Sequence, residues 1–197
     1  MIRREVRRSV IAILLLTLVF GLAFPALMTG FAQLAFANKA NGSLVDVNGR
    51  VVGSRLAAQA FSSPRYFHPR PSATAPAYNA GATTFANLGP TNPALAKNVG
   101  ARVRSVLRLE RPYDPGLTIG GIPVDAVTTS GSGIDPDISP AYAALQARRI
   151  AAVRHLSLAR VTQLIHENTE GRSLGFLGEP GVNVLGLNLA LDREGSN

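Results

Sequence analysis

The sequence predicts an α+β protein with a single N-terminal transmembrane helix and one external domain. Three observations carry this prediction. A cluster of arginines precedes a long uncharged stretch; a β-hairpin signal follows it directly; and helix-start signals then alternate irregularly with short β-type runs. We place the cytoplasmic end and membrane helix at residues 1–38 and the external α+β domain at residues 39–197.

The composition excludes several classes of protein before any motif is considered. The 197 residues are 46% hydrophobic and only 16% charged, with a mean hydropathy of +0.16, which is too apolar for a disordered chain. The chain contains no cysteine. A disulfide framework, a zinc-thiolate centre, an iron-sulfur cluster and a cysteine nucleophile are therefore excluded.

The first segment has the properties of a membrane anchor. Arginines occupy positions 3, 4, 7 and 8, and the next 30 residues, Ser9–Asn38, carry no ionisable side chain. About 20 apolar residues suffice to span a bilayer, and Pro25 is expected to kink the helix. By the positive-inside rule the N-terminus is cytoplasmic, and the domain that follows lies outside.

A cleaved signal peptide is the alternative. Ala35-Phe36-Ala37 has the A-x-A form of a cleavage site. The apolar stretch, however, is roughly twice as long as the h-region of about 7 to 15 residues that signal peptides use. A retained anchor in the cell membrane is therefore favoured.

The net charge belongs partly to the anchor. The chain as a whole carries +8, which on a folded surface would suggest nucleic-acid binding. Residues 40–197 hold 15 of the 20 basic and 11 of the 12 acidic residues, which is a net charge of +4. We therefore expect the lipid bilayer to be a partner, and no nucleic acid.

The first half of the external domain begins with a hairpin. Asn48-Gly49 lies between two short β-type runs, 44–47 and 50–52, as in a type I′ turn. The segment 62–93 is rich in proline and glycine and is expected to be a long loop. Asn92-Pro93 then predicts a helix over about 93–110, whose basic face we interpret as solvated in preference to a lipid or partner surface.

Further elements are predicted in the second half. Residues 124–128 form a short β-type run, and Ser139-Pro140 starts a helix over about 140–154. Ser157 caps a third helix that stops near Gly171. The apolar residues between 182 and 191 alternate, with a slip of phase at 184/185, which predicts a central strand with a bulge near Gly186.

No motif specifies a catalytic, cofactor or metal site. Gly116 and Gly121 have the outer spacing of a phosphate loop, but Ile122-Pro123 stands where Lys and Ser/Thr are needed. Asp135, Asp137 and Ser139 resemble the start of a calcium loop, but its glycine and its glutamate are replaced by proline and glutamine. The three histidines show no ligand spacing to one another. We predict a non-catalytic chain without a metal.

Four segments carry a resemblance to a known family. They are Ala40–Leu44, Tyr66–Ala73, Thr128–Pro136 and Asn183–Asp192. Together they resemble the C subunit of the Kdp potassium-transporting ATPase, and the resemblance extends over essentially the whole chain, anchor included. The block Tyr-Phe-His-x-Arg-Pro-Ser-Ala at 66–73 is the most specific part of it.

The resemblance implies an accessory subunit of a high-affinity, ATP-driven potassium importer. Its partners would be a channel-like potassium-translocating subunit, a P-type ATPase subunit and a small membrane peptide. In the family the C subunit is described as needed for assembly and as a catalytic chaperone that raises the ATP affinity of the pump subunit. ATP is thus implied only through that subunit. The alternatives are an exported, membrane-anchored hydrolase and an envelope binding protein.

Two polar segments are candidates for contact with a partner. Tyr66–Ala73 and Ser130–Pro136 combine small or rigid residues with hydrogen-bonding groups and lack the apolar periodicity of core elements. The alternative is that both are ordinary structural loops. The candidate contact residues are Tyr66, His68, Arg70, Ser130, Ser132 and Asp135.

Overall fold

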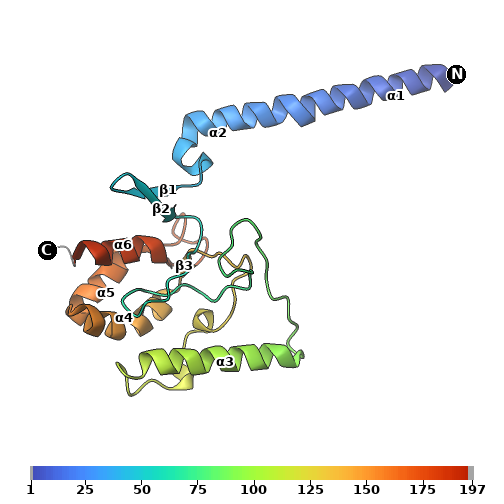
Figure 1. Cartoon of the computed structure of the whole chain (residues 1–197). Coiled ribbons are helices and arrows are strands. Elements are labelled where there is room, and N and C mark those ends of the chain that lie inside the picture. The colour runs from blue at the N-terminus through green and yellow to red at the C-terminus, as the bar shows by residue number, and fades with distance from the viewer. Residues whose placement is uncertain (1, 195–197) are drawn as a thin grey trace. The chain divides into compact units, whose positions relative to one another are not determined.

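A computed structural model describes residues 2–194 of the chain. The fold divides into two compact units, Met1–Leu44 and Val45–Asn197, and Figure 1 shows the elements of each. The first is a long helix and the second combines helices with small sheets. This is the α+β arrangement that the sequence predicts.

The first unit is one continuous helical segment. It consists of α1 (Ile2–Leu16), the π-helical η1 (Thr17–Ala23) and α2 (Phe24–Ala40). This 39-residue helix is long and apolar enough to cross a membrane, with a mean hydropathy of 2.7 over its most apolar window. Pro25 follows the π-helical turn, where the hydrogen-bond register changes and a missing N–H is accommodated. The kink that the sequence predicts at Pro25 lies at Phe36, whose backbone angles are not helical (φ −140°, ψ 37°).

The predicted hairpin is confirmed. Strands β1 (Leu44–Val47) and β2 (Arg50–Ser54) form a two-stranded sheet. Asn48 and Gly49 both have positive φ, 55° and 79°, as a type I′ turn requires. The Asp46 Oδ1 atom accepts a hydrogen bond from the Gly49 N–H (2.8 Å) and secures the turn.

The second sheet has three short antiparallel strands in the order β3-β5-β4. They are β3 (Asp137–Ile138), β4 (Thr169–Glu170) and β5 (Gly181–Asn183). Val182, on the central strand, is paired with Ile138 on one side and Thr169 on the other. Val182 is fully buried, so this small sheet is tied directly to the core.

The predicted strand over 182–191 is largely wrong. Only Gly181–Asn183 is extended, and Val184–Glu194 forms helix α6. The change of phase at 184/185 marks the switch from the two-residue period of a strand to the helical period, not a bulge at Gly186. Val184, Leu187, Asn188 and Leu191 recur at helical spacing and are all buried.

The other helices agree with the sequence. The structure contains α3 (Pro93–Glu110), α4 (Pro140–Arg154) and α5 (Leu158–Glu167). Their N-caps accept backbone hydrogen bonds, as expected for Asn and Ser at this position: Asn92 from Ala94, Ser139 from Tyr142 and Ser157 from Arg160. His155, with φ 57°, ends α4 in the left-handed conformation. The third helix stops at Glu167, four residues before Gly171.

Two further segments, 124–128 and 62–92, have no regular strand or long helix. Val124–Ala126 is a 3-10 turn, η3, and not part of a strand; it follows η2 (Ile119–Gly121). Pro123 precedes η3, and the Thr128 hydroxyl and N–H both bond to the Val124 carbonyl, which closes a turn. The proline-rich segment 62–92 contains neither helix nor strand, as predicted.

The hydrophobic core lies around α4. Helix α4 packs against α5, α3 and β5, and Leu187 and Leu191 of α6 belong to the same buried cluster as its alanines and Ile150 (Figure 1). Phe67, from the long loop, is fully buried in the same cluster. The loop is therefore part of the core and not a cover over it. Burying a phenylalanine side chain contributes about 1.5–3 kcal/mol, which fixes this part of the loop against the helices.

Candidate partner-binding loops

The loop that contains Tyr66–Ala73 is fastened to two helices by side-chain amides. Asn188, on α6, accepts from the Phe67 N–H (2.8 Å) and donates to the Phe67 carbonyl (3.0 Å). Gln146, on α4, does the same for His68, at 2.8 and 3.1 Å. Both amides are buried. Two consecutive residues of the loop thus receive from side chains the pairing that a neighbouring strand would otherwise supply.

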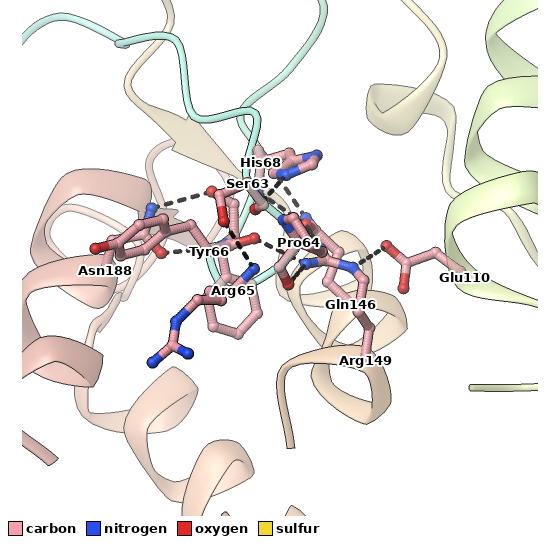
Figure 2. A network of polar contacts seen from close by, with 10 residues as sticks. Ser63, Pro64, Arg65, Tyr66, His68, Glu110, Gln146, Arg149 and Asn188 are labelled. Atoms are coloured by element: carbon pink, nitrogen blue, oxygen red, sulfur yellow. Dashed lines mark hydrogen bonds and ion pairs between the residues drawn. The ribbon is translucent and has the colours of Figure 1, made fainter. Parts of the chain in front are cut away.

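Arg149 extends this network and is fully buried (Figure 2). Its Nε atom donates to Glu110, at the end of α3, at 2.9 Å. Its terminal nitrogens donate to the carbonyls of Pro64 and Tyr66 and to the Gln146 side chain. One guanidinium therefore connects α3, α4 and the loop. An unpaired buried cation would be costly, and this one is both paired and hydrogen-bonded.

Burial changes the ionisation of two groups in this network. Burial raises the pKa of Glu110, and the neighbouring Arg149 opposes that rise. The pKa of His68 is lowered by burial, and Arg149 adds to the effect; a hydrogen bond to the Ser63 carbonyl acts in the opposite direction. Because a carbonyl can only accept, His68 carries its proton on Nε2, 3.0 Å from the Ser63 oxygen.

The two candidate segments lie against each other. Arg70 forms an ion pair with Asp135 at 3.0 Å and reaches the carbonyl of Thr129 at 3.4 Å. The Ser72 hydroxyl donates to the Gly133 carbonyl at 2.6 Å. Segments about 60 residues apart in the sequence are thereby joined into one surface.

All six candidate contact residues have partners within the chain. The Tyr66 hydroxyl donates to Asp192 (3.1 Å), and its ring lies 4.9 Å from the Arg154 guanidinium. Ser130 is buried and accepts from the Gly133 N–H. Ser132 is exposed and accepts from the Ile134 N–H. These contacts explain how the loops are ordered, while contact of the six residues with a partner stays a prediction.

The hollows beside these loops differ in the ionisable residues that line them. One of about 430 Å³ lies between α3, the 85–89 loop and Thr128–Gly131, and Arg102 is the only ionisable residue in its lining. Arg102 donates to the Val127 carbonyl at 3.3 Å. This lining has no carboxylate or imidazole and so offers no general base. A second hollow of about 430 Å³ does contain carboxylates, and three of them have hydrogen-bond partners within the chain: Asp125, Asp135 and Asp137. Within residues 2–194, no group of three or more His, Asp or Glu side chains could hold a metal ion.

Sequence reasoning missed two features. The first is the network of Glu110, Gln146, Arg149 and Asn188, because polar residues inside helices carry no sign of which partner they meet. The second is the hairpin 171–180 between β4 and β5, which exposes three large apolar side chains. Its signal was available in the sequence, since Leu174, Phe176 and Leu177 lie among turn residues and outside any periodic pattern.

Comparison with known proteins decides the family. Residues 6–193 match the family described as K+-transporting ATPase, c chain. The chain belongs to this family. The match includes both the apolar N-terminal helix and nearly all of the α+β unit.

Individual members of the c-chain family are similar over nearly their full length. A potassium-transporting ATPase KdpC subunit of Methylococcus capsulatus is 55% identical over 185 residues, which cover 93% of this chain and 95% of that protein. The KdpC subunit of Sorangium cellulosum is 54% identical over 189 residues, covering 95% and 97%. That of Beijerinckia indica is 48% identical, covering 96% and 93%. The resemblance seen in the four sequence segments is confirmed.

Proposed function

We propose that this chain is a non-catalytic accessory subunit of a Kdp potassium-transporting ATPase. The observation that carries the proposal is the family match over residues 6–193, which takes in the anchor and the domain together. The apolar helix holds the subunit in the cell membrane, and the α+β domain binds other subunits. In this role the chain supports assembly and stability of the complex.

The domain is proposed to lie outside the cytoplasm. Arg3, Arg4, Arg7 and Arg8 precede the apolar helix, and such a cluster holds its end of a membrane helix on the cytoplasmic side. The second unit then faces the outer side, from which potassium enters an importer. Covering the outer mouth of the channel-like, ion-translocating subunit is consistent with this placement.

An effect on ATP use would be indirect. ATP is bound on the cytoplasmic side, which an external domain cannot reach. We propose that the chain raises the ATP affinity of the P-type pump subunit by stabilising the assembled complex, with the small membrane peptide as a further partner. Neither the glycine pattern at Gly116 and Gly121 nor the hollow beside α3 supplies a phosphate-binding lysine.

Purification of the complex tests the central proposal. The tagged chain is isolated from native membranes in mild detergent, and the co-purifying proteins are identified. Recovery of a P-type ATPase subunit and a channel-like subunit is the expected result. Hydrolase activity of the chain alone, or its recovery without any multi-span protein, contradicts the proposal. In the reconstituted complex, leaving the chain out should raise the ATP concentration needed for half-maximal hydrolysis.

Topology has a separate test, because the chain has no cysteine of its own. Ser54→Cys, on β2, should react with a membrane-impermeant thiol reagent that is added to cells with a permeabilised outer membrane and an intact inner membrane. Labelling only after lysis of the inner membrane reverses the orientation. The mature protein should begin near Met1, whereas an N-terminus at Asn38 would establish cleavage and remove the anchor.

A further inference from the structure

The connection between β4 and β5 is a tightly closed hairpin that projects from the small sheet. Ser173 and Leu177 exchange two backbone hydrogen bonds, both at 2.9 Å. Arg172 and Glu179 form an ion pair at 2.7 Å across its base. The hairpin is mounted on β5, whose Val182 is fully buried in the core. The segment 172–179, here called the apolar tip, is therefore held in place by backbone pairing at a fixed position on the sheet.

The apolar tip exposes three adjacent large hydrophobic side chains. Leu174 is 82% exposed, Phe176 68% and Leu177 49%. Single exposed apolar residues are ordinary, but a rigid cluster of them indicates an interaction site. None of the three belongs to the core cluster or to the residues packed against it. Their side chains thus add little to the stability of the domain.

Leu174 gives the stronger argument, because its backbone conformation is unfavourable for leucine. Its φ is +55°, in the left-handed region that glycine and asparagine adopt readily and that costs other L-residues free energy. The turn itself accounts for the conformation: Leu174 and Gly175 are its central residues, both have positive φ (55° and 82°), and the Phe176 N–H donates to the Ser173 carbonyl at 3.3 Å. Such a turn requires positive φ but not leucine, and asparagine would adopt it at a lower cost. Neither the turn nor the core explains a leucine whose side chain is 82% exposed, which points to a function of the side chain.

We propose that the apolar tip is an anchor that inserts Leu174 and Phe176 into an apolar pocket on another subunit of the potassium-transporting ATPase. This inference rests on the proposed function, since it names the surface by which the subunit binds its complex. Rigid, exposed apolar and aromatic side chains are typical of the few residues that dominate an interface. Because the tip is preorganised, little conformational entropy is lost on binding.

Two other occupants fit less well. A lipid surface favours unpaired cations and Trp or Tyr beside the apolar residues, but the one cation of the tip is paired with Glu179, and residues 171–180 contain no Lys, Trp or Tyr. A second copy of the tip fits poorly as well, because three side chains bury a few hundred Å² at most, against about 1,200–2,000 Å² in a specific dimer. The tip is suited to be the anchor of a larger interface with a different protein.

Substitution at Leu174 separates binding from folding. Leu174→Asn places in the left-handed conformation a residue that tolerates it, so the thermal unfolding temperature of the full chain in detergent should stay the same or rise. Its affinity for the other subunits should fall at least about tenfold, which corresponds to about 1.4 kcal/mol. The affinity of the Phe176→Ser variant for the other subunits should fall by a similar factor. Ile119→Asn, at an exposed position on η2 (65%), is the matched control and should retain wild-type binding.

A thiol probe distinguishes the occupants. Ser173→Cys introduces the sole cysteine of this chain beside Leu174. It should be labelled readily by a hydrophilic maleimide when the full chain is alone in a lipid nanodisc, and at least about tenfold more slowly in the complex. Protection in the nanodisc without other subunits would assign the tip to lipid. Protection that depends on the concentration of the lone chain would assign it to a second copy.

The outcomes separate this inference from the proposed function. If wild-type chain is not recovered with the other subunits, the proposed function fails. If wild-type and Leu174→Asn chains are recovered equally, the proposed function stands and the proposal that the apolar tip binds another subunit is overturned. A lower unfolding temperature for Leu174→Asn, or an equal loss of binding for Ile119→Asn, also overturns it, because the leucine would then serve the fold or the effect would not be specific to the tip.

Discussion

The Nε atom of Arg149 lies 2.9 Å from Oε1 of Glu110, and both side chains are almost completely buried. This pair joins α4 to the end of α3, while the other guanidinium nitrogens hold the loop at Pro64 and Tyr66. The pair itself adds little net stability, because removing two charges from water offsets much of their attraction. Its consequence is architectural: the loop and α3 are positioned by one side chain.

Breaking this pair from one side is expected to be severe. Arg149→Met should lower the free energy of unfolding by roughly 3–5 kcal/mol, because it leaves Glu110 buried without a cation and two loop carbonyls without a donor. Glu110→Gln also leaves one charge of the pair, Arg149, without a counter-ion, but it keeps an oxygen for the Arg149 N–H and the donors to the two loop carbonyls, so it should cost less. Chemical unfolding of the full chain in detergent measures both. Equal losses in the two variants would contradict the additional cost assigned to the loop carbonyls.

Asn188 is expected to be nearly as important, although it carries no charge. Asn188→Leu would leave the N–H and the carbonyl of Phe67 without partners, and each unsatisfied buried group costs about 1–3 kcal/mol. We expect a loss of about 2–4 kcal/mol in the free energy of unfolding. Gln163→Leu, at an exposed amide on α5, is the matched control and should change stability by about 0.5 kcal/mol or less.

Several elements of the fold could be predicted from the sequence. The starts of helices α3 and α4 were predictable, because an Asn-Pro or Ser-Pro pair begins each of them with a cap and a first-turn proline. The hairpin was predictable from Asn48-Gly49 alone. Here the signal is local, since the residues that cause the structure lie within it.

The C-terminal segment was not predictable in the same way. Residues 181–194 contain both a strand and a helix, and an alternation of apolar residues fits either over so short a stretch. The sequence assigns no role to Asn188, which bonds from α6 to a loop residue 121 positions away. Polar pairing over such distances in the sequence depends on the complete fold, which explains why the buried network was missed.

The basic face of α3 is interpreted as solvated. If it is, changes of charge on this face should alter the free energy of unfolding only slightly. Lys97, Arg104, Arg108 and Arg111 recur at spacings of seven, four and three, and all four are exposed. Arg104→Glu replaces a like-charge neighbour of Arg108 with a favourable i,i+4 pair, so the free energy of unfolding should rise by about 0.5 kcal/mol. Arg104→Ala, which only removes the repulsion, should give a smaller gain. A loss of stability in both variants would show that Arg104 has a structural contact.

His68 is expected to make stability depend on pH. Its folded-state pKa lies below the ordinary value of 6.5 because of burial, so between the two values the unfolded chain binds more protons than the folded one. The free energy of unfolding should therefore fall as the pH is lowered from about 7 through about 6. His68→Gln should flatten this dependence in unfolding experiments at a series of pH values. Groups with raised carboxyl pKa values, Glu110 and Asp137, have the opposite sign and act nearer their ordinary values of 4.5 and 3.8.

The contact between the two candidate loops can be separated from their contact with a partner. Asp135→Asn removes the charge that faces Arg70 but keeps the oxygen that accepts from the Asp137 N–H. Because the pair is only about three-quarters buried, the free energy of unfolding should fall by about 1 kcal/mol or less. Ser132→Ala, on the exposed edge of the same surface, should leave unfolding unchanged.

If the joined loops bind a partner, the variants Tyr66→Ala, Arg70→Ala and Asp135→Asn should all be recovered with the other subunits in lower yield than wild type, while the full chain of each still unfolds cooperatively near the wild-type temperature. Arg and aromatic side chains are frequent among the residues that dominate an interface, so Tyr66 and Arg70 should show the larger losses. Recovery of all three at the wild-type level would assign the surface to the fold alone. Unfolding of the chain by each substitution would do the same, since Tyr66 and Arg70 already hold the loop against Asp192 and Asp135.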